Sequence, residues 1–275
     1  MTVPQIEPGY VRTRRGRLHI ACCGEDAAPP VLLLHQTPRS VAEYRAVLPL
    51  LGARWRAIAL DTPGFGASDA LPEGASIEGW ADAAAALLEA LGIARAHVVG
   101  HHTGGVIAIE LAAARPERVA RLVLSSTPWI DAAERARRAQ RGAIDRVEPR
   151  ADGSHLAELW RRRAPFYPAG RPELLHAFVL DALKVLEDVE AGHDAVTRYA
   201  MDERIVLVRA PALVLQAGAD PFAAPHAATL AARLHNATLQ RIEAGMVPLP
   251  EQLPEAFAAA VERFLDGDGA ARPHG

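Results

Sequence analysis

Cysteine is scarce in this chain, and its placement excludes a disulfide framework. The 275 residues contain two cysteines, Cys22 and Cys23, which are adjacent in the sequence. Neighbouring cysteines are poorly placed to bridge one another, and the pair has no zinc-ribbon spacing. Because a chain without disulfides is typical of a reducing compartment, we expect a cytoplasmic protein.

The sequence also lacks an excess of charge and a long apolar segment. Thirty Lys and Arg residues against 33 Asp and Glu residues give a net charge of −3, and Lys184 is the only lysine. Nucleic acid and anionic membranes attract basic surfaces, so neither is an expected partner. No stretch approaches the roughly 20 apolar residues of a membrane helix, and residues 1–10 lack the apolar core of a signal peptide.

What the sequence does contain is the composition of a globular protein. Half of its residues are hydrophobic, which is enough for one large domain with a substantial core. Short apolar runs alternate with longer Ala- and Leu-rich segments of helical period, a pattern that predicts an α/β fold with a mostly parallel sheet. The predicted strands are residues 10–14 and 17–23, which form a hairpin, and residues 31–35, 55–61, 97–100, 121–126, 212–217 and 238–242.

Predicted helices separate these strands, and one long helical segment interrupts the alternation. The helices between strands are residues 41–51, 77–91, 105–114, 225–234 and 250–265. Residues 129–204 contain charged helical stretches and no convincing strand. We therefore expect a core formed by residues 1–128 and 205–275, with residues 129–204 as a helical cap inserted after the sixth strand.

Chemistry-bearing residues follow four of the predicted strands. In parallel α/β sheets ligands bind at the carboxyl ends of the strands. The segments found there are HQTP at residues 35–38, DTPGFGASD at residues 61–69, GHHTGG at residues 100–105 and AGADP at residues 217–221.

These four segments, in this order, resemble the α/β-hydrolase superfamily over nearly the whole chain. Its members carry HGxP after the third strand, DxPGxGxSD after the fourth and the nucleophile elbow G-x-S-x-G after the fifth. The resemblance implies the α/β-hydrolase fold, an eight-stranded, mostly parallel sheet flanked by helices, with a helical cap. It also places the acid of the catalytic triad at Asp220.

Two positions depart from the superfamily pattern. His102 stands in the elbow where the nucleophilic Ser, Cys or Asp is expected, and Met246 stands where the triad histidine is expected. A serine needs an imidazole to take its proton, and that imidazole needs a carboxylate to orient it. Acyl-serine chemistry at this elbow is therefore excluded.

The elbow histidine suits a different chemistry. Imidazole titrates near neutrality, so His102 is a candidate general base on water or on a substrate C–H or O–H group. In an ordinary triad roughly 7 to 8 Å separate the elbow oxygen from the acid, and histidine reaches roughly 2 to 3 Å further than serine. The sequence thus predicts a gap of about 5 Å between His102 and Asp220, bridged by one water molecule. The resemblance places the oxyanion hole at the backbone N–H groups of Thr37 and Thr103.

The remaining candidates line a pocket or fill space. The predicted pocket residues are His35, Gln36, His155, Trp160, His193 and Met246. Met246 is interpreted as an apolar filler of the vacated imidazole space, and His101 as a packing residue. Of the run Arg161–Arg163, most is expected to be a solvated helix face, with one guanidinium turned inward toward an anionic substrate. His35, His101 and His102 lack the spacing of a metal site, so neither a metal nor an organic cofactor is expected.

Two function classes follow from these residues. The first is an enzyme that acts on a small, mostly apolar ester, lactone or β-dicarbonyl compound, either by hydrolysis or by C–C lyase, decarboxylase or isomerase chemistry. The second is an inactive α/β-hydrolase-fold protein that binds a ligand or acts as a sensor. In both cases the expected partner is a small molecule, and a homodimer is compatible with the sequence.

Overall fold

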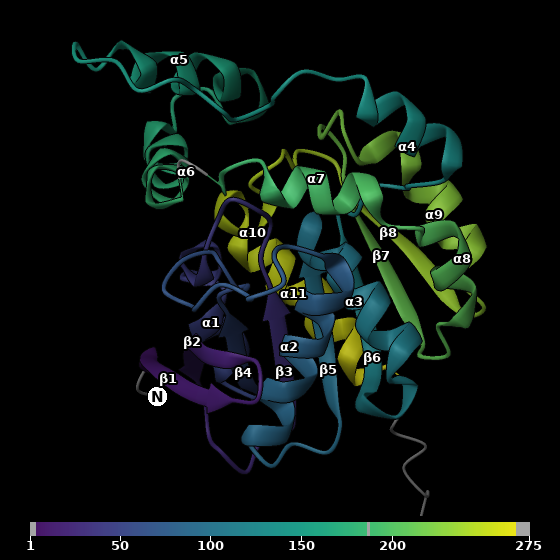
Figure 1. The fold of residues 1–275 in the computed structure, drawn as a ribbon. Helices are drawn as coiled ribbons and strands as arrows, with labels where there is room; N and C mark the ends of the chain where they lie inside the picture. Colours follow the sequence, from purple (N-terminus) through teal and green to yellow (C-terminus); the bar gives the residue numbers. More distant parts are fainter. Residues whose placement is uncertain (1–3, 186–187, 268–275) are drawn as a thin grey trace, which may run out of the picture.

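The computed structural model describes residues 4–185 and 188–267, and an eight-stranded sheet forms its centre (Figure 1). The strand order is β1-β2-β4-β3-β5-β6-β7-β8. Strand β2 pairs antiparallel with β1 and β4, and all other pairs are parallel. The strands are β1 Glu7–Thr13, β2 Gly16–Cys23, β3 Pro30–Leu34, β4 Arg56–Leu60, β5 Ala96–His101, β6 Val119–Ser125, β7 Ala212–Ala217 and β8 Ala237–Ile242.

Helices cover both faces of the sheet, as continuous apolar strands require. Alternate side chains of the central strands enter two separate cores. Leu32, Val98 and Leu122 pack with α2 and α3 on one face, whereas Val31 and Val99 pack with α1 and α11 on the other. The helices of the sheet region are α1 Leu48–Gly52, α2 Ile77–Ala90, α3 Thr103–Ala114, α9 Ala227–Arg233, α10 Leu249–Gln252 and α11 Pro254–Asp266. This arrangement confirms the predicted α/β-hydrolase fold with its mostly parallel sheet.

Two predicted helices are each divided by proline. The segment predicted at residues 41–51 forms a 3-10 turn at Val41–Tyr44 and the separate helix α1. The segment predicted at residues 250–265 forms α10 and α11. Proline has no N–H, so Pro49 and Pro254 cannot donate the bond that a continuous helix needs at those positions, but both are accepted in the first turn of a new helix.

Between β6 and β7 the chain forms a group of helices, which we call the cap. They are α4 Ala132–Ala139, α5 Ser154–Arg163, α6 Pro172–Lys184, α7 Ala191–Arg198 and α8 Met201–Arg204. Figure 1 shows α5 and α6 at upper left, α7 above the sheet and α4 at upper right. Helices α5 and α6 have a small apolar core of their own, in which Leu159, Leu175 and Phe178 are buried. The remaining short 3-10 segments are Pro116–Arg118, Ala164–Phe166, Ile205–Leu207 and Ala224–His226.

A buried arginine joins the cap to the sheet region. The Arg39 side chain has no exposed surface; its Nε lies 3.1 Å from Asp181 Oδ2 on α6, and its Nη2 lies 2.9 Å from Glu251 Oε1 on α10. Ser40 Oγ also donates to Asp181 Oδ2, at 3.0 Å. Because a guanidinium can be buried only with such partners, these contacts fix α6 against the loop after β3.

Within the ranges 4–185 and 188–267, no helix has the length and apolar character needed to cross a bilayer.

Candidate active site

The turn between β5 and α3 holds His102 in an unusual backbone conformation. His102 has φ 47° and ψ −114°, between the last residue of β5 and the first of α3. The turn is tight: a Cβ atom on Gly104 would lie 1.9 Å from Leu34 O, and one on Gly100 would lie 2.3 Å from Gly104 O. Only glycine fits at these two positions, and positive φ in a residue other than glycine is typical of strained functional turns.

The imidazole of His102 contacts Asp220 directly. His102 Nε2 lies 2.8 Å from Asp220 Oδ2, and the two atoms meet as an electrostatic pair rather than as a well-directed hydrogen bond. The predicted gap of about 5 Å with a bridging water is therefore wrong. That distance came from a triad in which a third side chain holds the acid away from the elbow; here no imidazole stands between the two residues, so the elbow ring reaches the acid itself.

The loop after β7 holds Asp220 as a carboxylate. Its side chain is buried, and Oδ1 accepts the backbone N–H groups of Phe222 at 2.8 Å and of Ala223 at 3.2 Å. Burial raises the pKa of Asp220, but the interaction with the adjacent His102 ring and the N–H of Phe222 outweigh burial and leave the pKa below its ordinary value. A negative charge beside His102 stabilises the imidazolium that forms when the ring takes a proton.

The neighbouring His101 has a structural role, as expected. Its Nε2 donates to Val247 O at 2.8 Å, and its Nδ1 accepts from Ser125 Oγ at 3.0 Å. Burial lowers the pKa of His101 to about 3, so the ring stays neutral. It packs edge-on against His102, with 4.8 Å between the ring centroids.

Two backbone donors face the region of the elbow. Within the part of the chain that the structure describes, the N–H groups of Thr37 and Thr103 donate to no protein acceptor, whereas the N–H of Gln36 is held by Glu43 Oε2 at 2.9 Å. The hydroxyls of Thr37 and Thr103 lie 2.9 Å apart, so the two residues are neighbours. Free N–H groups beside a reacting carbonyl can stabilise an oxyanion.

The cap closes directly over this pair. A Cβ atom on Gly192, at the start of α7, would lie 1.7 Å from Thr37 Oγ1. The backbone of α7 therefore rests on the Thr37 side chain, and glycine is needed for that approach.

A cavity of about 80 Å³ lies between the elbow and the cap. It brings together five of the predicted site residues, Gln36, Thr37, His102, Thr103 and His193. Gln36 Nε2 is buried and has no protein partner among the described residues, which leaves a donor available to a ligand. The other lining residues are Pro128, Arg138, Arg141, Ile144, Arg163, Val196, Phe222 and Val247. Of these, the sequence reasoning considered only Arg163.

Four residues predicted to line the pocket lie outside the lining of this cavity. His35 is fully buried; its Nδ1 donates to Gln36 O at 2.7 Å and its Nε2 accepts from Thr62 N at 2.9 Å, so the ring supports the loop. Burial lowers the pKa of His35. His155 accepts the N–H of Arg150 at 3.1 Å, and Trp160 packs against the core of α5 and α6. Both belong to the part of the cap farther from the sheet.

Met246 is the fourth of these residues. Its side chain is half-buried, its backbone N–H donates to Gln252 Oε1 at 2.6 Å, and the next residue, Val247, lines the cavity in its place. The position that corresponds to the triad histidine is therefore set back from the cavity, and it is the His102 ring that contacts the acid.

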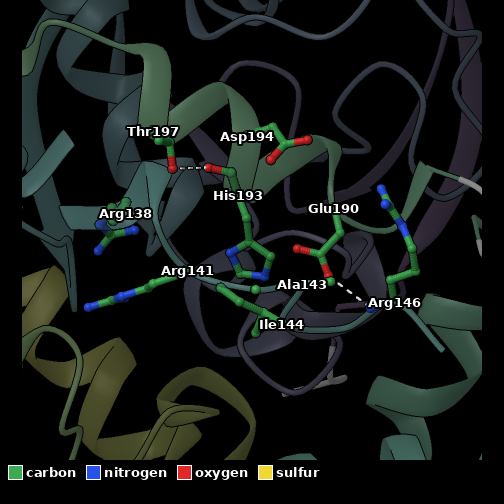
Figure 2. A pocket seen from close by; sticks show the side chains of 10 residues that line it. Arg138, Arg141, Ala143, Ile144, Arg146, Glu190, His193, Asp194 and Thr197 are labelled. Atoms are coloured by element: carbon green, nitrogen blue, oxygen red, sulfur yellow. Dashed lines mark hydrogen bonds between the residues drawn. The ribbon is translucent and has the colours of Figure 1, made fainter. Parts of the chain in front are cut away.

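The cap provides a second imidazole–carboxylate pair. His193 Nε2 on α7 lies 2.9 Å from Oδ2 of the buried Asp145, which also accepts from Arg163. Of the run Arg161–Arg163 only Arg163 lines the cavity, as expected for one inward guanidinium. The carboxylate of Glu190 accepts the backbone N–H groups of Asp145 and Arg146, and Figure 2 shows the bond from Arg146. Asp145 had no sequence signal, because its partners come from distant helices.

No group of three or more His, Cys, Asp or Glu side chains within residues 4–185 and 188–267 is arranged to hold a metal ion. The chemistry available at the elbow is that of an imidazole beside a carboxylate, two free N–H groups and a small cavity.

Comparison with known proteins places this geometry in a family. A family model described as alpha/beta hydrolase fold matches residues 29–246. The chain belongs to the α/β-hydrolase family. It is 31% identical over 227 residues to RutD of Caulobacter sp. (strain K31), which is assigned provisionally as a carbamate hydrolase, with 80% of this chain and 84% of that protein covered.

Solved structures of this family have the same fold. The enol-lactonase from Burkholderia xenovorans LB400 superposes with a TM-score of 0.77 at 22% identity, covering 94% of this chain and 99% of that chain. A thermophilic esterase from Thermogutta terrifontis superposes with a TM-score of 0.70 at 26% identity, covering 94% of this chain and 98% of that chain. These relatives are named as a carbamate hydrolase, an enol-lactonase and an esterase.

Proposed function

We propose that this chain hydrolyses a small carbonyl compound, an ester or a lactone, with water as the nucleophile and His102 as the general base. The observation that carries this proposal is the 2.8 Å contact between His102 Nε2 and Asp220 Oδ2 at the wall of the cavity. The names of the relatives, a lactonase and an esterase, support hydrolysis over C–C lyase or isomerase chemistry.

The proposed reaction uses the nitrogen of His102 that faces away from the acid. With Nε2 next to Asp220, Nδ1 takes a proton from water as the water oxygen attacks the carbonyl carbon. The carbonyl oxygen becomes negative and accepts from the N–H groups of Thr37 and Thr103, which together can contribute about 3 kcal/mol. When the tetrahedral intermediate collapses, the imidazolium returns its proton to the leaving oxygen, and the acid and the alcohol are released.

This mechanism forms no covalent acyl-enzyme, which separates it from the serine route. A fluorophosphonate that reacts with activated serines should not label the protein, whereas a serine acting as nucleophile would be labelled and would contradict the proposal. Intact-mass measurement after incubation with the reagent distinguishes the two.

The central experiment is the substitution His102→Ala, with His176→Ala as control because His176 is exposed on α6. Turnover of a panel of 4-nitrophenyl esters and small lactones should fall by about 100- to 10,000-fold in the first variant and stay unchanged in the second. Equal turnover in H102A and the parent protein would refute the role of His102. No turnover in any form, with ligand binding retained, would favour the ligand-binding alternative.

A further inference from the structure

A second hollow lies next to the cavity beside His102, in the cap. It has a volume of about 230 Å³ and shares Arg138, Arg141, Ile144 and His193 with that cavity, so the two are adjacent. Figure 2 shows Arg138 and Arg141 on one side of this hollow, Glu190 and Arg146 on the other, and the His193 ring between them. A ligand that occupies both parts would meet the elbow at one end and the two arginines at the other.

Positive charge is in excess on the arginine side. The cavity at the elbow is lined by Arg138, Arg141 and Arg163 and, among the described residues, by no Asp or Glu. Asp145 neutralises Arg163, with Oδ1 2.6 Å from Arg163 Nε. Arg138 pairs with Glu134 at 2.7 Å, and the Arg141 guanidinium has only the same carboxylate nearby, at 3.9 Å.

The Glu134 carboxylate is close to three arginines, two in the last turn of α4 and one just after its end. Glu134 accepts from Arg138 Nε at 2.7 Å and from Arg137 Nε at 2.7 Å, and the Arg141 guanidinium lies 3.9 Å from it. Burial lowers the pKa of Arg138, and the charges of Arg141 and Arg137 lower it further, against the opposing effect of Glu134. The cluster therefore holds more positive than negative charge beside a cavity.

The acidic residues of the cap hollow do not cancel this excess. Glu190 accepts the backbone N–H groups of Asp145 and Arg146, and in Figure 2 it lies across the hollow from Arg138 and Arg141. Asp194 is exposed to solvent. Solvent screens an exposed carboxylate, so its effect on the arginines is small.

We propose that Arg138 and Arg141 form a carboxylate-binding subsite, so that the substrate carries a carboxylate at one end and the scissile carbonyl at the other. Guanidinium groups pair with carboxylates through two parallel hydrogen bonds, which gives both affinity and orientation. This inference rests on the proposed hydrolysis at His102 and names the class of its substrate: half-esters of short dicarboxylic acids, or lactones that carry a carboxyl group.

The kinetic test compares a charged ester with a neutral one. In the parent protein, kcat/KM for mono-4-nitrophenyl glutarate should exceed that for 4-nitrophenyl butyrate. Arg141→Gln should lower the ratio of the two values about tenfold, the effect of losing one charge-assisted contact. Arg141 is the residue to change because its side chain is 40% exposed, which makes a folding defect a small risk.

Arg137 provides a matched control. It lies in the last turn of α4, four residues before Arg141, pairs with the same Glu134 and is 59% exposed, but it does not line either part of the cavity. The R137Q variant should keep the ratio of the parent protein. An equal fall of the ratio in R141Q and R137Q would show a general charge effect and overturn the subsite.

A binding measurement separates this inference from the proposed function. Glutarate is titrated calorimetrically into H102A, H102A with R141Q, and H102A with R137Q, at constant ionic strength. Weakening of at least about tenfold in the R141Q form alone supports the subsite even if no ester is hydrolysed by the parent protein. Unchanged glutarate affinity in that form, or inorganic phosphate binding as tightly as glutarate, would overturn a carboxylate subsite and leave the role of His102 to its own test.

Discussion

His102 combines a position at the turn between β5 and α3 with a direct contact to a buried carboxylate. Its Nε2 lies 2.8 Å from Asp220 Oδ2. The buried Asp220 is tied to two backbone N–H groups, so it can fix one edge of the ring while the other edge stays free for a proton.

The charge of Asp220 should therefore be essential to turnover. Asp220→Asn keeps an oxygen for the N–H groups of Phe222 and Ala223 but removes the charge beside His102. We expect kcat to fall at least about 100-fold, because the imidazolium loses its stabilising partner. Steady-state kinetics on a 4-nitrophenyl ester, with melting temperatures to check folding, measure this.

Asp26→Asn is the control for that substitution, because the Asp26 side chain is 90% exposed and far along the chain from the elbow. It should leave kcat unchanged. If D220N retained the turnover of the parent protein, the carboxylate would have no part in the reaction and the pairing of His102 with Asp220 would be structural only.

At the scale of elements, the elbow depends on how closely α3 approaches β3. The first turn of α3 passes the end of β3 so closely that a methyl group on Gly104 would collide with the carbonyl of Leu34. The contacted atom is a backbone oxygen, which cannot move aside as the end of a flexible side chain can. A side chain at position 104 would therefore displace β3 or α3.

We expect Gly104→Ala to lower the free energy of unfolding by about 3 kcal/mol or to prevent soluble expression. Gly9→Ala is a suitable comparison, because nothing lies within 4 Å of the Cβ position at Gly9 on β1. Urea unfolding of both variants tests this, and a G104A protein as stable as G9A would show that the turn is less constrained than the contact distance implies.

The sequence predicted the elements better than it predicted the contacts between them. Strand periodicity and the glycine-rich turns placed the sheet, because these signals are local. Two predicted helices are each divided by a proline, Pro49 or Pro254, and both prolines are visible in the sequence. By contrast, the direct contact of His102 with Asp220 depends on how two loops approach in space, which a distance borrowed from another triad misjudged.

Contacts inside the cap were the least accessible to sequence reasoning. Asp145, Arg163 and His193 come from separate segments and meet only after α5 and α7 have folded together. Charged residues on cap helices look alike in the sequence, whether they end in solvent or against a cavity. His155 and Trp160 were predicted at the pocket because they lie in the cap segment, and the structure places them elsewhere.

For the whole molecule, buried histidines should make stability sensitive to acid. The pKa of His101 is lowered to about 3 in the folded protein, from 6.5. Between these values the unfolded chain binds a proton that the folded chain does not, so the free energy of unfolding falls as the pH decreases through this window. The fall reaches about 1.4 kcal/mol per pH unit for one such group, and the buried His35 acts in the same direction.

Urea unfolding measured from pH 6.5 to 4.5 should therefore show a loss of about 2 to 3 kcal/mol that His101→Gln removes, although this variant is less stable at neutral pH. His176→Gln should leave the slope of the parent protein in place, since His176 is exposed. Parallel stability curves for H101Q and the parent protein would mean that His101 is protonated in the folded state at these pH values.

The ion pairs of Arg39 restrict how small molecules travel to and from His102. Moving α6 away from the sheet would separate the buried Arg39 guanidinium from Asp181. It would leave these charges, and Glu251 beside them, without their full set of partners. Leaving a buried charge without its partner costs about 3 to 5 kcal/mol, so that flank should stay shut during turnover. We therefore expect ligands to enter between α4 and α7, where Arg138 and His193 line the hollow in the cap.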